Sequence, residues 1–370
     1  MHCGQQKERD GCMSGQTKVR KLHYDLLRIL AAFSVVMLHS SAQLWYDAPV
    51  NSRIWLTANS WNALVRFGVP IFVMISGAIF LDKQRELEPG RLYRHNILRL
   101  AVVYIMWSLF YGLWDYSRFD FSQLEPSQMK PWKLFVNEWV SGRYHLWFLP
   151  MMLGIYVLLP VLRTWVGHAQ KKELEYFLVL FLVFQIGRET LRVAAYGRPI
   201  ILSVLNTAKV EAVCGYLGYF VLGYYLERFG LPHKWHKVIY GAGILGEIAN
   251  VICSNLIALH TGERRGDVYD SFTIFTFCVV AALFLAAREW VSKWHFSSGA
   301  EVLITAVSAD TLGIYLAHVG VLEWLFRVHP TWFTTMPAVS IPGLALLSFG
   351  VCMMAAAVLR RIPVIGRYLC

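Results

Sequence analysis

A series of ten apolar segments, beginning at residue 22 and separated by short polar stretches, constrains this fold most strongly. Each segment is about 17–25 residues long, which is the length that a helix needs to cross the hydrocarbon core of a bilayer. The segments cover residues 22–44, 58–81, 97–117, 145–167, 174–195, 207–227, 237–259, 271–290, 302–326 and 341–359. We therefore expect an all-α polytopic membrane protein, a bundle of about ten transmembrane helices.

The composition supports a multi-pass membrane protein and excludes several soluble classes. Of the 370 residues, 56% are hydrophobic and 16% are charged, against roughly 45–50% and a quarter in soluble domains. This balance excludes a disordered chain, a collagen and a disulfide scaffold. The net charge of +11 does not indicate nucleic acid, because Lys and Arg lie between apolar segments, where anionic lipid headgroups are the expected partner. No Cys-x-x-Cys pair occurs among the seven cysteines, so we expect no metal site and no bound cofactor.

The chain divides into a polar start and one membrane domain. Residues 1–17 lack an apolar core and a cleavage site, so we expect a disordered extension and no signal peptide. Residues 18–370 would form the membrane domain, with one short interfacial helix, Trp132–Val140, in the longest gap. With the N-terminus inside, the inner segments hold about twice as many Lys and Arg as the outer ones. This bias predicts that both termini are cytoplasmic.

Three ionisable residues share the first apolar segment. Asp25 and Arg28 are three residues apart, so they lie on one helix face and can form an ion pair. His39 follows Arg28 by eleven residues, which is about three turns, or roughly 16 Å further along the same face. Snorkelling of Arg28 and an interfacial hydrogen bond of His39 would explain each residue singly. Their alignment on one helix instead favours a function.

The chemistry of these side chains outlines a path across the membrane. Histidine accepts and returns a proton near neutral pH, and a guanidinium near the inner surface suits a phosphorylated ligand. In the predicted orientation Arg28 lies toward the cytoplasm and His39 toward the outer surface. The pattern therefore predicts anion binding on the inside and proton chemistry further out.

Six sequence features, in the same order along the chain, resemble the acyltransferase 3 family of integral membrane acyltransferases. The first segment resembles this family in its opening Asp25-x-x-Arg28 and its later His39. The other matching strings are Phe67–Gly77, with Pro70 and Ser76-Gly77, Arg99 at the start of the third segment, His145–Leu149, Tyr219–Tyr224 and Thr311–His318. Within the family, the chain looks most similar to members that O-acetylate enterobacterial common antigen.

This resemblance implies a ten-helix acyltransferase and a role for each matching residue. Acetyl-coenzyme A would be the acyl donor substrate and would bind from the cytoplasm, and the acceptor would be an envelope glycan or a lipid-linked saccharide. His39 would act as general base for the acceptor hydroxyl or as an acetyl relay. Arg28, Arg94 and Arg99 would bind the donor. Ser76 would donate a hydrogen bond near the thioester, or Ser76-Gly77 would simply let two helices pack closely.

The third segment departs from the family pattern at one position. Many members carry Arg-x-x-Arg there, whereas this chain has Asn96 three residues before Arg99. If the first arginine of the pair binds coenzyme A phosphate, the nearby Arg94 must substitute for it.

The remaining candidates each have a structural alternative. Glu211 could orient His39, as carboxylates do in catalytic triads, or it could form an ion pair. The catalytic candidates are therefore His39, Asp25 and Glu211. His318 could be a second acid or base, or make a structural hydrogen bond. His145 and Trp147, near the outer surface, could bind a sugar, or belong to the aromatic belt of a membrane protein.

Three classes of function remain at this point. An O-acetyltransferase of the cell inner membrane is the leading hypothesis. A secondary transporter would also place buried charges among its helices, although no internal repeat relates the two halves of the chain. A non-catalytic partner of glycan export could keep the same fold.

Overall fold

The computed structural model describes residues 20–85, 87–118, 131–196 and 211–362, with 198, 201, 203, 204, 207 and 366, and for 131, 134 and 211–214 only the backbone. Most of its described residues are helical, and none of them is in a strand. The longer helices are α1 (Leu22–Asp47), α2 (Arg53–Leu64), α3 (Gly68–Phe80), α5 (Leu98–Tyr116), α7 (Phe148–His168), α8 (Lys171–Leu180), α11 (Glu211–Phe229), α12 (His233–Thr261), α13 (Ile274–Glu289), α14 (Ser298–Val328) and α16 (Pro337–Arg360). Shorter elements are α4 (Pro89–Arg91), η1 (Leu92–Ile97), α6 (Pro131–Ser141), η3 (Tyr144–Trp147), η4 (Phe181–Gly187), α9 (Arg188–Ala194), η5 (Gly266–Tyr269), η6 (Val291–Lys293) and α15 (Pro330–Thr334).

Eight helical stretches of the described chain are long and apolar enough to cross a membrane. They coincide with eight of the ten predicted segments and confirm an all-α membrane protein. The predicted segment 174–195 is helical from α8 through η4 to α9, and 207–227 overlaps α11, but neither is among the eight. The number ten therefore stays a prediction. The predicted extension 1–17 lies outside the described residues.

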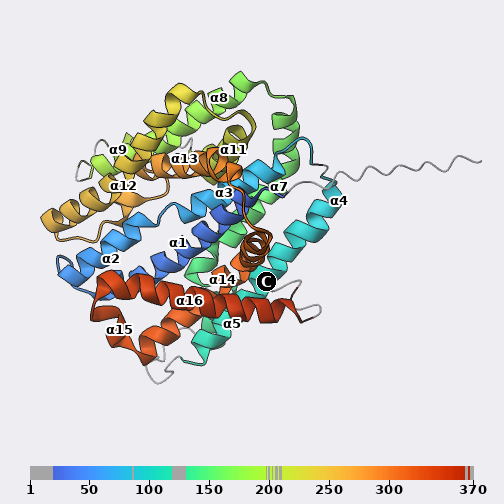
Figure 1. The fold of residues 1–370 in the computed structure, drawn as a ribbon. Helices are drawn as coiled ribbons and strands as arrows, with labels where there is room; N and C mark the ends of the chain where they lie inside the picture. The colour runs from blue at the N-terminus through green and yellow to red at the C-terminus, as the bar shows by residue number, and fades with distance from the viewer. Residues whose placement is uncertain are drawn as a thin grey trace, which may run out of the picture.

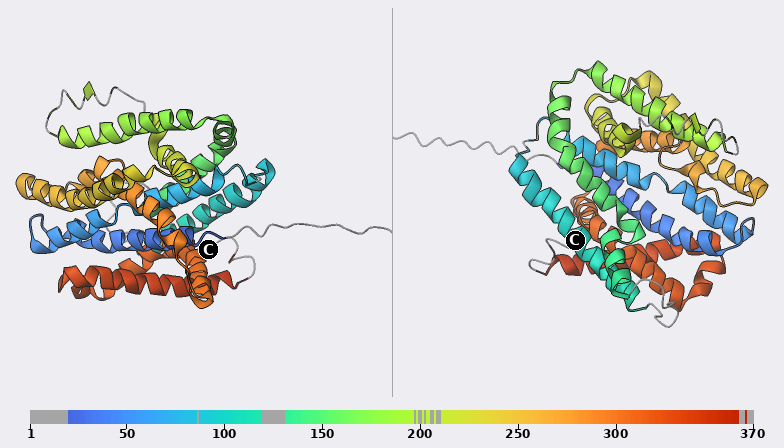
Figure 2. Two further views of the ribbon diagram at one scale, coloured as in Figure 1. Left: turned by 45° about the horizontal axis from the view of Figure 1, so that its top comes forward. Right: turned by 180° about the vertical axis from the view of Figure 1, so that it is seen from behind.

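Helix α1 runs through the middle of the bundle (Figures 1 and 2). It packs against α2, α3, α14 and α16. Small and β-branched residues form its buried faces, including Ala31, Ala32, Val35 and Val36, and their short side chains let neighbouring helices approach closely. Because α1 is surrounded in this way, polar residues along it face other helices.

Helices α3 and α11 make the tightest contact near this centre. A Cβ atom added at Gly77 would overlap the backbone oxygen of Phe220, and one added at Gly223 would overlap that of Met74. Gly77 therefore provides the close helix packing that was one of the two predictions for Ser76-Gly77. Ser76 lines a cavity together with Arg28 and Arg99.

The second predicted segment, 58–81, is interrupted. Helix α2 ends at Leu64 and α3 begins at Gly68, with a turn between them. Pro70 explains the break, because it lacks an N–H group and its ring clashes with the carbonyl four residues earlier in a continuous helix. Arg66 lies in the turn.

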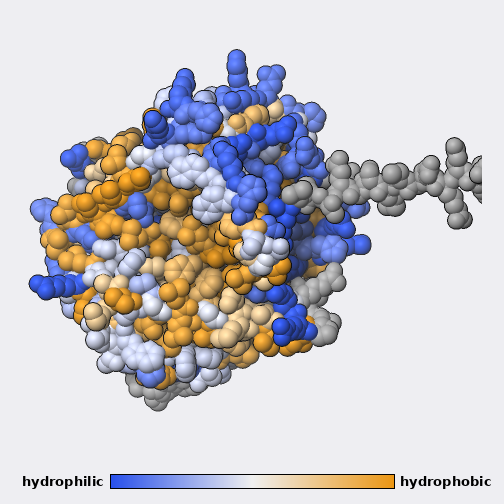
Figure 3. Space-filling view, in the orientation of Figure 1, coloured by the Kyte–Doolittle hydropathy of each residue, from blue (hydrophilic) through white to orange (hydrophobic). Residues whose placement is uncertain are grey.

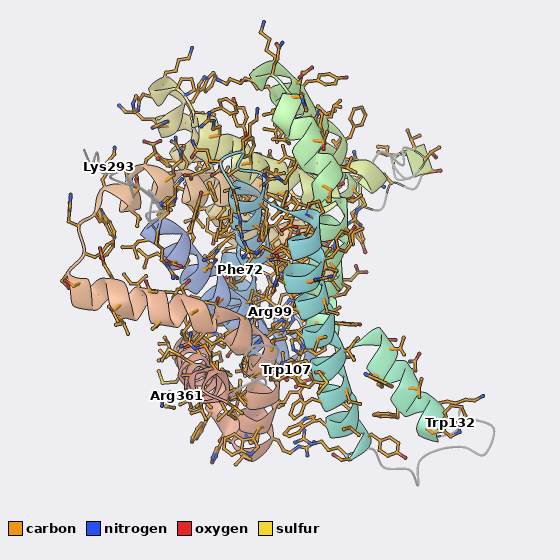
Figure 4. The ribbon with its side chains drawn as sticks, turned by 90° about the vertical axis from the view of Figure 1, so that its right-hand side faces the viewer. Phe72, Arg99, Trp107, Trp132, Lys293 and Arg361 are labelled. Carbon is orange, nitrogen blue, oxygen red and sulfur yellow. The ribbon has the colours of Figure 1, made fainter. Side chains whose placement is uncertain are left out.

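The surface agrees with a membrane location. In Figure 3 hydrophobic residues cover the middle of the visible face, and hydrophilic residues gather toward its right-hand and upper margins. Exposed apolar side chains on the outer helices include Leu245 of α12 and Leu346 of α16. The predicted interfacial helix Trp132–Val140 is present as α6, which packs beside the far end of α5, with Trp132 at its outer tip (Figure 4).

Candidate functional site

Three histidines from distant parts of the chain meet inside the bundle. His39 comes from α1, His145 from η3 and His318 from α14. The ring centroid of His318 lies 5.0 Å from that of His39 and 5.4 Å from that of His145. The structure thus brings together three candidates that were selected from separate sequence strings.

Hydrogen bonds to backbone carbonyls fix the state of two of these rings. Nδ1 of His318 lies 2.6 Å from the carbonyl oxygen of Tyr315, so Nδ1 carries the hydrogen and Nε2 is left as an acceptor. Nε2 of His145 donates in the same way, 3.4 Å from the carbonyl of Leu316. The other nitrogens, Nδ1 of His145 and Nε2 of His318, are buried and have no hydrogen-bond partner among the described residues, and the same holds for Nδ1 of His39. The cluster therefore offers unpaired ring nitrogens for a proton or a ligand hydroxyl.

A cavity of about 710 Å³, here called the His39 cavity, opens beside the histidines. Aromatic and polar side chains line it together, which is the composition of a site that binds a polar ligand with flat apolar faces. Its walls include Trp45, Tyr46, Asn62, Arg66, Tyr144, His145, Trp147, Phe148, Asp270, Tyr315 and Glu323. Trp147, a predicted acceptor residue, is half exposed.

A second cavity, here called the Arg99 cavity, lies further back along α1 and has a volume of about 240 Å³. Arg28, Ser76 and Arg99 line it among mostly apolar residues such as Phe72 and Met152. Figure 4 shows Phe72 and Arg99 near one another in the middle of the molecule. The Oγ atom of Ser76 donates to the carbonyl of Phe72, 2.9 Å away. Three of the four predicted donor residues therefore share one cavity.

Arg94, the fourth, is exposed and does not line this cavity. The wall at that point is formed by His95 and Asn96, which belong to η1, a π-helical turn directly before α5. Asn96, three residues before Arg99, therefore lines this cavity, and the donor role of Arg94 stays a prediction.

A third cavity of about 770 Å³, here called the Asp25 cavity, surrounds the start of α1. One carboxylate oxygen of Asp25 lies 3.3 Å from Arg28, which confirms the predicted pair. Asp25 also accepts from Arg20, at 2.6 and 2.9 Å, and from Ser308 of α14 at 2.6 Å. The basic residues Lys21, Arg85 and Arg228 also line it, together with the acidic residues Asp82 and Glu227, and Lys21 pairs with Glu227.

Asp25 is separated from the histidines. His39 follows Asp25 by fourteen residues along α1, which corresponds to about 21 Å. Asp25 therefore holds Arg28 and does not contact the histidine cluster. Glu211 is the first residue of α11, and its side chain lies outside the described part of the structure.

The three cavities follow one another along α1. Arg28 lines both the Asp25 cavity and the Arg99 cavity. Phe148 and Tyr315 line both the Arg99 cavity and the His39 cavity. The three cavities thus lie in one line along the bundle. Phe148 and Tyr315 stand between the Arg99 cavity and the histidines.

The sequence analysis missed several residues of this line. Tyr315 donates from its hydroxyl to the carbonyl of His145 and forms part of the wall between two cavities. Its place in the string Gly313-Ile314-Tyr315, three residues before His318, was a usable signal. Arg66 donates to Asn62 and stands 4.7 Å from the ring centroid of Tyr269. Nothing in the sequence pattern indicated that Arg66 faces the histidine cavity.

Comparison with known proteins gives one match. Residues 22–357 match the acyltransferase domain that defines the acyltransferase 3 family. No curated protein and no solved structure gives a significant match. The matched region covers nearly the whole described chain and contains every residue that lines the three cavities except Arg20 and Lys21, and the protein therefore belongs to the acyltransferase 3 family.

Proposed function

We propose that this protein is an O-acetyltransferase of the inner membrane, which moves an acetyl group from cytoplasmic acetyl-coenzyme A to a hydroxyl group of an envelope glycan. Its type would be that of the enterobacterial common antigen O-acetyltransferases. The observation that carries the proposal is the line of cavities from Asp25 to His39. A family acyltransferase with its anion-binding groups at one end and its histidines at the other can accept its two substrates from opposite sides.

The donor would occupy the inner two cavities. Arg20, Lys21, Arg28, Arg85 and Arg228 line the Asp25 cavity, and these cations suit the phosphates of the nucleotide part of coenzyme A. The narrow, mostly apolar Arg99 cavity suits the thin pantetheine arm and its thioester. In the proposed orientation, with both termini cytoplasmic, the nucleotide enters from the cytoplasm.

The transfer would take place where the Arg99 cavity meets the His39 cavity. An unprotonated ring nitrogen of His39 takes the proton of the acceptor hydroxyl while the hydroxyl oxygen attacks the thioester carbonyl. The tetrahedral intermediate collapses, the C–S bond breaks, and the coenzyme A thiolate leaves with the proton returned from the histidine. The second unpaired nitrogen, on His318, can share the proton during these steps.

The acceptor would occupy the His39 cavity. Trp147 and Tyr144 offer aromatic faces on which a sugar ring can stack, and His145 and Asp270 offer hydrogen-bonding groups. The ring of Tyr144 lies 5.5 Å from that of His39. A sugar stacked there would bring its hydroxyl groups to the histidine cluster.

Single-turnover transfer by the purified protein tests this proposal. Wild-type protein with acetyl-labelled acetyl-coenzyme A and a glycan acceptor should release coenzyme A and give labelled acceptor. His39→Gln keeps hydrogen-bonding capacity but cannot transfer the proton, so it should lose about 10²–10⁴-fold in rate while still binding donor. A transporter or an export partner would leave acetyl-coenzyme A intact, and folded His39→Gln protein with the wild-type rate would remove His39 from the mechanism.

A further inference from the structure

An apolar groove on the outside of the bundle lies behind the histidine cluster. It has a volume of about 380 Å³ and is formed by α5, α14 and α16. Its lining is almost wholly apolar and rich in aromatic residues: Trp107, Phe110, Tyr111, Trp114, Ala317, Gly320, Val321, Trp324, Leu325, Leu347 and Val351. None of these residues has a role in the transfer described above.

The groove follows one face of each helix. Trp107, Tyr111 and Trp114 recur at spacings of four and three residues along α5, over about 10 Å of helix. On the opposite wall, Ala317 and Gly320 of α14 are small and leave the hollow. A Cβ atom added at Gly320 would meet only Tyr111, at 3.5 Å. The shape is thus a channel along the membrane-facing surface, suited to an extended apolar chain.

Two arginines lie at the end of the groove away from Ala317 and His318, where Glu323 of the His39 cavity is near Arg118. The Arg118 guanidinium lies 3.7 Å from the ring centroid of Trp114, and Arg327 follows Trp324 by three residues on α14. In the part of the chain that the structure describes, neither arginine forms an ion pair. Desolvation and then the positive charge of Arg327 lower the pKa of Arg118. Asp115 and Glu323 also lie near Arg118, but both already pair with Arg143, so the two arginines still favour an added anion.

The groove and the His39 cavity share a wall. Tyr111 lines the groove, and its ring lies 4.9 Å from that of His145. Arg143 stands 5.2 Å from the Tyr111 ring centroid and donates to Glu323, which lines the His39 cavity. A molecule with its apolar part in the groove would therefore have its polar end beside the histidine cavity.

We propose that this groove binds the polyprenyl chain of a lipid-linked saccharide, with its phosphate at Arg118 and Arg327 and its sugar reaching the His39 cavity. The proposal rests on the proposed function and assigns its acceptor to the membrane-anchored class. Three neighbouring features have to be matched by one ligand: an apolar channel, a pair of cations and an aromatic, polar cavity. A polyprenyl-phosphate-linked saccharide supplies a chain, a phosphate and hydroxyl groups in that order, whereas a simple phospholipid supplies no sugar.

Binding of a long-chain polyprenyl phosphate, measured by native mass spectrometry of the full-length protein, tests the groove without any need for activity. Leu347→Trp fills the groove from α16, and its neighbour Leu346→Trp, exposed outside the groove, is the matched control. We expect Leu347→Trp to weaken binding at least about tenfold and Leu346→Trp to leave it unchanged. Equal binding by the two variants, or equal competition by phosphatidylglycerol, would overturn the proposal.

The rim is tested by the double variant Arg118→Ala and Arg327→Ala, with the exposed Arg53→Ala as control. The double variant should bind polyprenyl phosphate at least about tenfold more weakly, because charge-assisted hydrogen bonds are lost, and should bind uncharged polyprenol as the wild type does. Unchanged binding of the phosphate, or parallel loss of both ligands, would contradict a phosphate site. Since both arginines are at the surface, this variant does not depend on repacking the groove.

A transfer assay separates this inference from the proposed function. Leu347→Trp should raise KM for a lipid-linked acceptor and leave KM for a tail-free, water-soluble acceptor unchanged. If Leu347→Trp leaves both KM values unchanged, the groove has no role and the proposed function stands. If the wild type transfers to neither acceptor but retains polyprenyl phosphate, the proposed function fails and the groove remains.

Discussion

At the scale of single residues, the structure separates two tasks that lie on one helix. Asp25 and Arg28 form an ion pair near the start of α1, and His39 lies near its end with two other histidines. About 21 Å of helix between Asp25 and His39 excludes a direct contact between the carboxylate and the imidazole. The residues that bind the donor and the residues that move the proton can therefore be tested independently.

Asp25→Asn should affect donor binding and not the chemical step. The amide cannot hold the guanidinium groups of Arg20 and Arg28 as the carboxylate does, so KM for acetyl-coenzyme A should rise several-fold while kcat at saturating donor stays near the wild-type value. Initial rates across a range of donor concentrations give both parameters. A fall in kcat as large as that of His39→Gln would place Asp25 in the chemistry.

Arg99 and Arg94 offer a matched pair on neighbouring turns. Arg99 lines the inner cavity and Arg94 does not, so Arg99→Ala should weaken binding of acetyl-coenzyme A by about tenfold or more, and Arg94→Ala should change it little. Arg99→Lys should keep only part of the affinity, because an ammonium cannot reproduce the planar fork of a guanidinium. Isothermal calorimetry with the three variants measures this, and equal affinity in Arg99→Ala and Arg94→Ala would refute the assignment.

At the scale of helices, small residues determine where the cavities lie. The contact of Gly77 with the backbone of Phe220 fixes α3 against α11, and the neighbouring Ser76 then faces the Arg99 cavity. The break between α2 and α3 ahead of Pro70 turns Arg66 toward the histidines. Helix packing and one helix break therefore place the polar residues of two cavities.

Gly77→Ala should destabilise the protein measurably. The added methyl group overlaps the Phe220 carbonyl, and overpacking of this kind costs about 1–3 kcal/mol. Gly154→Ala in α7 is the control, because nothing lies within 4 Å of its added Cβ atom. Thermal unfolding in detergent should show a lower Tm for Gly77→Ala alone, and equal Tm values would show that α3 and α11 can separate without cost.

The sequence predicted elements better than it predicted their connections. Long apolar segments identify helices because a bilayer demands that length, and eight candidate spans and α6 follow from them. The break before Pro70 lay within a continuous apolar run, and the π-turn η1 shifts which residues face the cavity. Hydrophobicity alone cannot show either feature, which is why neither the position of Arg66 at the His39 cavity nor that of Asn96 at the Arg99 cavity was predicted.

At the scale of the whole molecule, the proposed reaction follows the order of the three cavities along α1. Five basic residues line the first cavity beside three acidic ones, the second is small and mostly apolar, and histidines and aromatic residues line the third. The central claim of this account is that the acetyl group passes along this line from one side of the membrane to the other. An enzyme of this kind transfers the acetyl group between two compartments, whereas other acetyltransferases bind both substrates on one side of the membrane.

Sealed, inside-out membrane vesicles containing the protein measure this directly. Labelled acetyl-coenzyme A is added outside, where the cytoplasmic face is exposed, and the acceptor glycan is enclosed in the lumen. We predict labelled glycan that an externally added esterase cannot reach until the vesicles are opened, and none with His39→Gln. Label that appears only when donor and acceptor are on the same side of the membrane would contradict the account.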